Sequence, residues 1–192
     1  ISDRTFERQI KTLPPGCRLM PAVKGDAYGL GAVPVARELN RLGVQHLCVA
    51  TLAEGMELRK NGVTGEILIL GYTPPEAASL LRRHRLAQTA VDTAHAEALA
   101  GQGVPLDVHL KIDTGMNRLG ERAENLESIS RVFALLHLHV RGVYTQLSAC
   151  EGTDPADVAF TQGQITRFWR LMEGLVARGV PAPPAHVQCS YG

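Results

Sequence analysis

Short β-rich runs alternate along this chain with segments whose apolar residues recur at helical spacing. The runs carry apolar residues at consecutive positions, as Glu66–Leu70 shows most simply, so both faces of such strands must be covered. This alternation predicts an α/β fold in which helices cover a parallel sheet. The predicted strands are Leu19–Lys24, His46–Ala50, Glu66–Leu70, Ala87–Val91, Leu106–Asp113, Leu138–Gln146 and Ala185–Cys189. The clearest helical stripe consists of Ile165, Phe168, Trp169, Met172, Leu175 and Val176.

Two α/β architectures fit this pattern, a doubly wound sheet and a (β/α)₈ TIM barrel. A dinucleotide-binding doubly wound sheet would place GxGxxG after its first strand, and Lys24–Gly29 does not supply that motif. Seven strands at this spacing favour a barrel that lacks its last βα unit or units. We therefore expect residues 1–192 to form one incomplete barrel domain of about seven strands.

Charge and composition exclude several classes of partner. Lys and Arg number 20 and Asp and Glu 19, so a net charge of +1 offers no basic excess for nucleic acid. No apolar run is long enough to span a membrane, and the start does not resemble a signal peptide. The chain lacks an initiator Met, so we expect it to be a piece of a longer protein. The cysteines are widely spaced, which predicts buried reduced thiols, a cytoplasmic location and no metal site; they are Cys17, Cys48, Cys150 and Cys189.

Lys24 ends the otherwise apolar first run and is the first candidate for chemistry. At the carboxyl end of a barrel strand its amine would be partly desolvated, which lowers the pKa and makes the amine a nucleophile for a carbonyl. A lone lysine at a strand end more often reaches solvent. Three glycines in the next seven residues favour the functional interpretation, because they let the backbone approach a bulky ligand. Tyr28 offers a hydroxyl to a phosphate.

The fifth run supplies a second cluster. Strand alternation places His109, Lys111 and Asp113 on one face, which would be the barrel interior. Charged side chains there need partners or a function, and an internal Lys–Asp pair is as good an interpretation as a functional one. Arg118, in the following loop, can present its guanidinium to an anionic oxygen. Ser190, after the seventh run, is a weaker candidate phosphate ligand.

Two stretches together resemble the alanine racemase family. Residues 21–31 (Pro-Ala-Val-Lys-Gly-Asp-Ala-Tyr-Gly-Leu-Gly) are similar to its cofactor-attachment motif. Residues 110–120 (Leu-Lys-Ile-Asp-Thr-Gly-Met-Asn-Arg-Leu-Gly) are similar to its second hallmark, in the right order and about 90 residues further on. The terminal stretch 186–192, together with Asp157–Thr161 and Gln164–Ile165, resembles most the racemase domain of the VanT type, a subgroup of membrane-bound serine/alanine racemases.

The resemblance implies a barrel that binds pyridoxal 5′-phosphate (PLP), followed by a C-terminal β-domain that this chain lacks. Lys24 would carry the cofactor and act as one of two catalytic bases, while a tyrosine of the C-terminal domain of the partner subunit in a homodimer would be the other. Tyr28 and Ser190 would hold the phosphate. Arg118 would meet the cofactor's phenolic oxygen, and Lys111, carbamylated in many relatives, would fix Arg118.

The chain departs from the family pattern at three positions. Gly25 and Leu30 replace residues that are usually Ala and His, and we expect little effect. Gln146 stands where the family usually has a histidine packed on the cofactor ring. Glutamine can also lie flat against the ring, although its electronic properties differ from those of histidine, so the resemblance implies that Gln146 contacts the cofactor ring.

We therefore expect a PLP-dependent racemase that interconverts L- and D-alanine or serine by two-base proton transfer. Its product would supply cell-wall or vancomycin-resistance peptidoglycan precursors, a membrane domain would lie elsewhere in the parent protein, and this chain alone would be inactive. The alternative is a non-catalytic PLP-binding barrel of the PLP-homeostasis type. Such carriers lack the Asp113–Arg118 run, although Gln146 fits them. A decarboxylase of the same fold type would not show the Lys24–Gly31 motif in this form.

Overall fold

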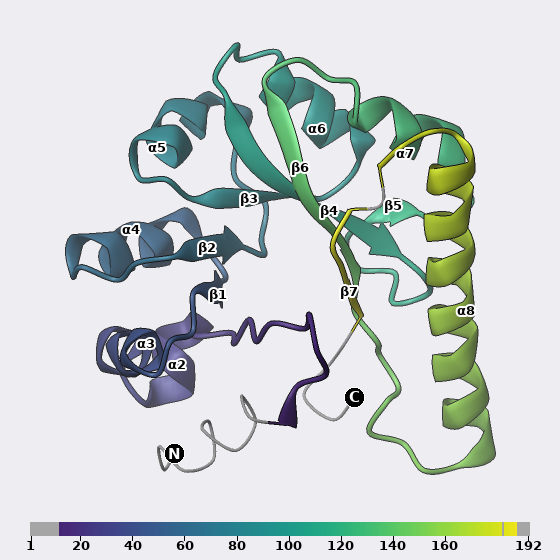
Figure 1. Cartoon of the computed structure of the whole chain (residues 1–192), viewed down its shortest axis with the longest axis horizontal. Helices are drawn as coiled ribbons and strands as arrows, with labels where there is room; N and C mark the ends of the chain where they lie inside the picture. Colours follow the sequence, from purple (N-terminus) through teal and green to yellow (C-terminus); the bar gives the residue numbers. More distant parts are fainter. Residues whose placement is uncertain (1–11, 182, 188–192) are drawn as a thin grey trace. The chain divides into compact units, whose positions relative to one another are not determined.

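The computed structural model describes residues 12–181 and 183–187, which divide into two compact units. The first unit comprises Ile1–Thr73 and Arg83–Ala87. Its elements are α2 (Lys24–Gly29), α3 (Ala32–Arg41), β1 (His46–Val49), α4 (Leu52–Lys60) and β2 (Glu66–Ile69). Strands β1 and β2 are parallel, and α4 packs against both of them (Figure 1). Leu47, Val49 and Ile67–Ile69 are fully buried, as consecutive apolar positions predict for a strand covered on both faces.

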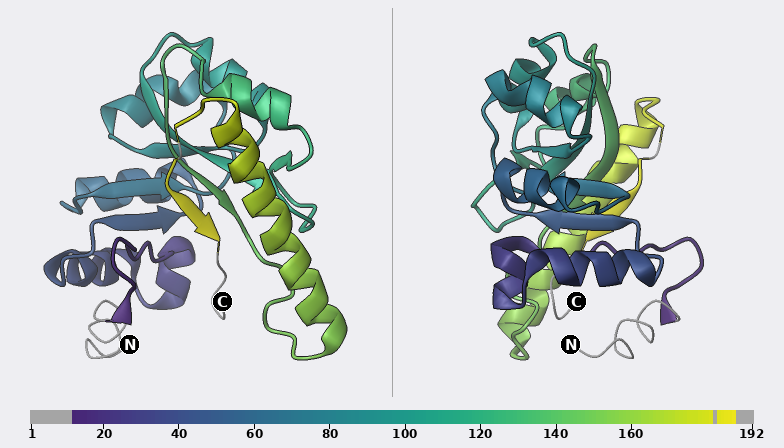
Figure 2. Two further views of the ribbon diagram at one scale, coloured as in Figure 1. Left: turned by 45° about the vertical axis from the view of Figure 1, so that its right-hand side comes forward. Right: turned by 90° about the vertical axis from the view of Figure 1, so that its left-hand side faces the viewer.

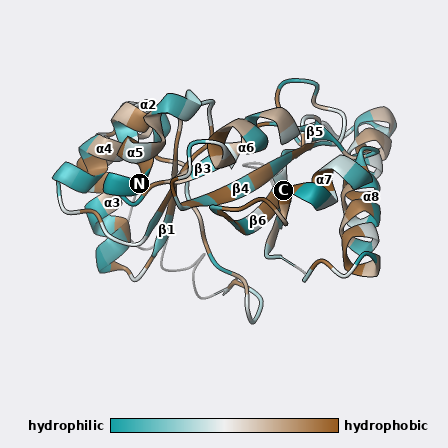
Figure 3. Cartoon of the chain, turned by 90° about the horizontal axis from the view of Figure 1, so that it is seen from above, coloured by the Kyte–Doolittle hydropathy of each residue, from teal (hydrophilic) through white to brown (hydrophobic). Residues whose placement is uncertain are grey.

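The second unit comprises Pro74–Arg82 and Gln88–Gly192. Its first elements are a 3₁₀ turn η1 (Pro75–Ala77), helix α5 (Ala78–Arg83) and strand β3 (Ala87–Ala90), of which only Arg83 and Ala87 belong to the first unit. The remaining elements are α6 (Thr93–Ala100), β4 (Leu106–Asp113), β5 (Glu121–Arg122), α7 (Leu126–Val132), β6 (Leu138–Thr145), α8 (Pro155–Ala177) and β7 (Ala185–Val187). The strands pair in the order β3-β4-β6-β7, all parallel, and the short β5 pairs with the carboxyl end of β4. Figure 3 shows the apolar character of β4 and β6.

Helix α8 begins at an aspartate cap, because the Asp154 side chain accepts a hydrogen bond from the Asp157 amide at 2.9 Å and Pro155 occupies the first turn. The helix is straight in the left-hand view of Figure 2 and packs against α7. Its predicted apolar stripe is divided in the structure: Phe168, Met172 and Leu175 are buried, whereas Trp169 and Val176 are about half exposed. None of the helices in the described ranges has the length and apolar character that a membrane span requires.

The predicted strands are found with two differences. Leu19–Lys24 is not a regular strand: it joins β1 only through the single bridge between Ala22 and Cys48, and Lys24 already begins α2. The last predicted strand is described as far as Val187, and its end lies outside the described residues. Sequence reasoning did not anticipate β5.

The cysteines do not all behave as predicted. Cys48 is a free, buried thiol, and burial raises its pKa to about 12. Cys17 is free but exposed. Cys150 is disulfide-bonded, so the prediction of a reduced thiol was wrong at that residue. The prediction failed because spacing along the chain does not show which thiols the fold brings into contact. Cys189 lies outside the described residues.

Candidate functional site

Lys24 directly precedes a left-handed backbone turn. Val23 is buried and its amide donates to the Cys48 carbonyl at 2.8 Å, which fixes the chain up to Lys24. The next four residues, Gly25–Tyr28, have φ between 53° and 58° and ψ between 37° and 47°, the left-handed helical region. Each of the three that is not glycine loses roughly 1–2 kcal/mol there. Backbone strain of this size gathers at functional sites, where surrounding contacts enforce it.

Two carboxylates hold this turn. Asp26 accepts from the Ala32 amide at 2.6 Å, which ties the turn to the first residue of α3. Glu54, in the first turn of α4, accepts from the Gly25 amide at 2.8 Å through Oε1. Its Oε2 accepts from the Ala50 and Thr51 amides at 2.6 and 3.1 Å. Glu54 was missed from the sequence, although its spacing from Thr51 is that of a capping box.

The amine of Lys24, the hydroxyl of Tyr28 and the exposed backbone of this turn suit a ligand that carries both a carbonyl and a phosphate. Lys24 is half-buried and presents a primary amine, and Tyr28 leaves 70% of its surface exposed although its backbone is strained. The space around Gly25 and Gly29 is open, since an added Cβ at either position would meet nothing within 4 Å. The turn therefore offers an amine, a phenol and an accessible backbone, which fit an aldehyde cofactor with a phosphate arm.

In the second unit Lys111 is buried near the end of β4. Its ammonium donates to the carbonyls of Ile112 at 3.1 Å and Leu119 at 3.3 Å, and lies 5.6 Å from the centroid of the Tyr144 ring. Burial lowers the pKa of Lys111 to about 8, Asp113 opposes that shift and Arg118 adds to it. The predicted interior position of Lys111 is confirmed. Its hydrogen bonds go to backbone carbonyls, so an internal Lys–Asp pair is not what anchors it.

This lowered pKa predicts a rise in stability at alkaline pH. An unfolded lysine keeps the ordinary pKa of 10.5, so between about pH 8 and 10.5 the unfolded chain binds more protons than the folded one. The free energy of unfolding should therefore increase through that window, by at most about 3 kcal/mol. This contribution is measured by urea unfolding of the wild type and of Lys111→Met in bicarbonate-free buffer. As pH rises, the free energy of unfolding of the wild type should increase relative to that of the variant. A pH-independent difference between the two free energies would contradict a lowered pKa of Lys111.

The loop after β4 is organised by Asp113. Its Oδ1 accepts from the amides of Gly115 and Asn117, both at 3.0 Å. Burial alone would raise the pKa of Asp113, but these amides, with smaller contributions from Lys111 and the Met116 amide, outweigh burial and hold the pKa below the usual value. The loop presents Arg118, which is exposed and donates to Gln146 Oε1 at 2.8 Å. The structure thus brings together Lys111, Arg118 and Gln146 at the carboxyl ends of β4 and β6.

The interior of the second unit contains a further series of polar side chains in contact with one another. His109 Nδ1 lies 2.9 Å from His186 Nε2, and the His186 ring stacks on Tyr144 with centroids 4.8 Å apart. The Tyr144 hydroxyl is 3.0 Å from the Thr89 hydroxyl. His109 is buried and partnered, as its predicted inward position requires. Ser190 lies outside the described residues, so its predicted phosphate contact stays a prediction.

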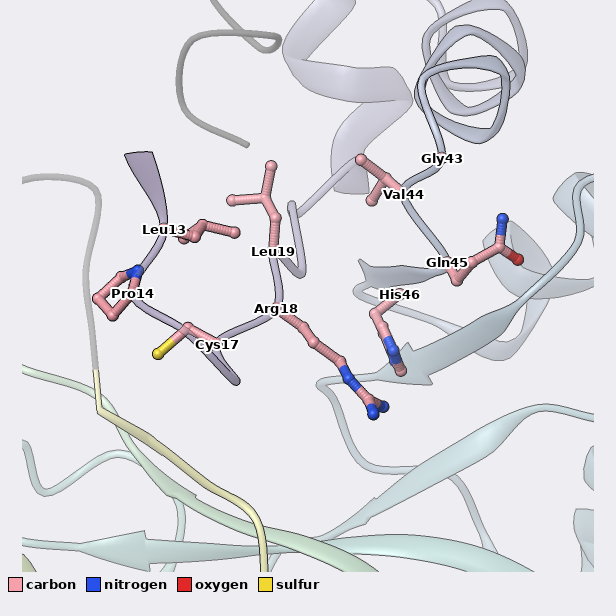
Figure 4. A pocket seen from close by; sticks show the side chains of 9 residues that line it. All are labelled: Leu13, Pro14, Cys17, Arg18, Leu19, Gly43, Val44, Gln45 and His46. Atoms are coloured by element: carbon pink, nitrogen blue, oxygen red, sulfur yellow. The ribbon is translucent and has the colours of Figure 1, made fainter. Parts of the chain in front are cut away.

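Each unit has a hollow among its described residues. A cavity of about 490 Å³ is lined by Leu13, Pro14, Cys17, Arg18, Leu19, Gly43, Val44, Gln45 and His46 (Figure 4). It lies at the amino end of β1, away from Lys24, whereas active sites of parallel α/β barrels lie at the carboxyl ends. A polar hollow of about 370 Å³ lies at the carboxyl end of β4, and its lining includes Asp113, Arg122 and Arg167. The second hollow lies at the expected end of its strand, but neither Lys111 nor Arg118 lines it.

Comparison with known proteins identifies the family. Residues 4–192 match the family model of the alanine racemase N-terminal domain. The chain is 41% identical to a serine/alanine racemase of Enterococcus gallinarum over 95% of the chain and 26% of that protein. It is 40% identical to an alanine racemase of Desulfovibrio desulfuricans, over 90% of the chain and 47% of that protein. The chain therefore spans about a quarter to a half of the length of these relatives.

Solved structures agree with the sequence matches. An alanine racemase of Clostridium difficile 630 superposes with a TM-score of 0.88 at 32% identity, covering 97% of this chain and 50% of that one. The alanine racemase of Bacillus anthracis with bound L-Ala-P gives 0.89 at 26% identity, covering 98% and 50%. The predicted fold class, a barrel domain of the alanine racemase type present in part, is confirmed. The chain belongs to the alanine racemase N-terminal domain family.

Proposed function

We propose that Lys24 carries PLP covalently and that this chain is the cofactor-binding part of a racemase for alanine or serine. The observation that carries the proposal is the Lys24 turn: a half-buried amine, followed by four left-handed residues that two carboxylates hold in place. A solvated surface lysine would need no such support. The family, whose named relatives are racemases, supplies the reaction class.

PLP, when bound, supplies an electron sink that stabilises negative charge at the amino-acid Cα. The chain's own residues would hold the cofactor and handle the proton. Lys24 acts as the base on one face of the substrate, Tyr28 and Ser190 bind the phosphate, and Arg118 donates to the cofactor's phenolic oxygen. Gln146 orients Arg118 through their hydrogen bond and contacts the cofactor ring.

Carbamylation of Lys111 is part of the same proposal. A neutral amine adds carbon dioxide and releases a proton, and a pKa of about 8 leaves about a tenth of Lys111 neutral at pH 7. The change replaces a cation by an anion close to Arg118, whose charge contributes to lowering the pKa of Lys111. The modified side chain would accept from the Arg118 guanidinium and hold it toward the cofactor.

The substrate and the assembly follow from the similarity to racemases. The relative named serine/alanine racemase supports alanine or serine as substrate. We propose a homodimer in which a tyrosine of a further domain acts as the base on the opposite face. We also propose a cytoplasmic catalytic domain, with a membrane domain elsewhere in the parent protein. The D-amino acid would then serve peptidoglycan precursors, including those of vancomycin resistance.

A non-catalytic PLP-binding barrel is the second candidate, and Gln146 is the observation that favours it. The Gln146 amide oxygen accepts from Arg118 and leaves an uncharged amide where the family pattern has an imidazole. This candidate predicts the same attachment at Lys24 without racemisation, so an assay of inversion on the loaded protein separates the two.

The attachment is tested by chemical trapping. Full-length protein is mixed with PLP, reduced with borohydride, digested and analysed by mass spectrometry. The label should lie on Lys24, because its amine stands in the proposed cofactor site, whereas the exposed Lys60 and the buried Lys111 should remain largely unlabelled. A label found mainly on Lys60 or Lys111, with Lys24 unmodified, would overturn the assignment.

A further inference from the structure

Glu54 connects the end of β1 to the backbone of the cofactor lysine. It belongs to α4, whose capping box needs only one of its hydrogen bonds, the one that Oε2 accepts from the Thr51 amide. The same oxygen accepts from Ala50, the residue directly after β1. The other oxygen accepts from the Gly25 amide, which is the peptide N–H that follows Lys24. One carboxylate therefore binds backbone amides of two separate segments, and Glu54 itself lies 29 residues from Gly25 in the chain.

We propose that Glu54 is a positioning residue for Lys24, and this inference rests on the proposed function of Lys24. The peptide between Lys24 and Gly25 is where the chain enters the left-handed turn. Hydrogen bonds to a carboxylate are stronger than those to neutral acceptors, and this bond opposes the strain of the three residues that follow Gly25. Without it, relaxation of Gly25 toward ordinary dihedral angles would swing the Lys24 side chain away from its place just after the Ala22–Cys48 bridge.

A carboxylate is required at this position because all its partners are donors. Both oxygens accept, and they accept from amides on two different segments. The amide of Glu54→Gln has the same shape but one oxygen, so whichever way it is turned, its NH₂ group faces an N–H donor. Two amides donate to Oε2 and only one to Oε1, so the single oxygen of the variant keeps the Ala50 and Thr51 bonds, and the Gly25 bond is the one that is lost.

The experiment compares three variants of the full-length protein. Glu54→Gln is the test. Thr51→Ala removes the other half of the capping box, the Thr51 Oγ1 acceptor of the Glu54 amide, and leaves the carboxylate in place. Glu57→Gln makes the same chemical change on the exposed side of α4, one turn later. Two quantities are measured: amide hydrogen exchange of the peptide around Gly25 without cofactor, and the rate at which PLP and borohydride label Lys24 relative to Lys60.

Glu54→Gln should speed exchange at Gly25 and lower the Lys24-to-Lys60 labelling ratio by roughly ten-fold to a hundred-fold, while Thr51→Ala and Glu57→Gln remain near the wild type. The proposal is overturned if Glu54→Gln leaves both quantities unchanged, or if Thr51→Ala lowers them as much, since helix capping alone would then explain the effect. If the wild type does not label at Lys24, the proposed function fails. The exchange measurement still decides whether Glu54 fixes the Gly25 peptide.

Discussion

Replacing Lys24 by alanine in the full-length protein is expected to abolish racemisation, with a loss of roughly 10⁴-fold or more. The substitution removes the only group in the Lys24 turn that can bond covalently to an aldehyde, and it removes a base at the same time. Lys24→Arg should fare little better, because a guanidinium keeps the charge and length but is neither nucleophilic nor basic near neutral pH. Racemisation of alanine and serine is followed by the loss of optical rotation or by an enantiomer-specific coupled assay.

The loss at Lys24 should occur without loss of folding. Lys24 is half-buried and follows the buried Val23, so truncating its side chain leaves the packing and the Val23 hydrogen bond intact. The free energy of unfolding should change by no more than about 0.5 kcal/mol. Lys60→Ala, at the exposed end of α4, serves as the matched control and should keep full activity. Activity of Lys24→Ala within ten-fold of the wild type would rule out the proposed chemistry.

The parts of the site that could be predicted from the sequence are those that depend on local order. The motif around Lys24 and the alternation along Leu106–Asp113 are contiguous, so strand periodicity alone placed His109 and Lys111 in the interior. The resemblance to a family likewise rests on contiguous runs. The fold class followed from the same local signals, because strands covered on both faces require helices between them.

The missed features depend on contacts between distant segments. Nothing near Lys24 in the sequence shows that Asp26, Ala27 and Tyr28 adopt positive φ, since only Gly favours that region. Besides the local bond of Asp26 to Ala32, the conformation is held from outside the turn by Glu54, which lies 29 residues from Gly25. The first run therefore read as a complete strand, although it has one bridge and then turns. The contact between Arg118 and Gln146 spans 28 residues and was invisible for the same reason.

Gly120→Ala is expected to cause the second large effect, because Gly120 closes the loop that presents Arg118. Its φ is +122°, outside the regions that L-residues adopt, and an added Cβ would lie 2.5 Å from the Asp113 nitrogen and 2.8 Å from the Ile112 carbonyl carbon. Both atoms belong to the backbone of β4, where Ile112 and Asp113 pair with β5 directly after Gly120, so relief of the clash would break this pairing. The clash and the dihedral strain together should lower the free energy of unfolding by about 3 kcal/mol or more.

Gly103→Ala separates the two causes of that loss. Gly103 also has positive φ, +68°, but an added Cβ there meets nothing within 4 Å, so the free energy of unfolding of this variant should fall by only about 1 kcal/mol.

The effect on the Arg118 loop is specific to Gly120. Displacement of the loop breaks the hydrogen bond from Lys111 to the Leu119 carbonyl and the one from Arg118 to Gln146. PLP affinity should therefore fall in Gly120→Ala and remain unchanged in Gly103→Ala. Urea unfolding and PLP titration of the two full-length variants measure both effects. Equal losses of stability in the two variants would show that the close contact of Gly120 with β4 contributes nothing. Unchanged PLP affinity in Gly120→Ala would show that this loop is not part of the cofactor site.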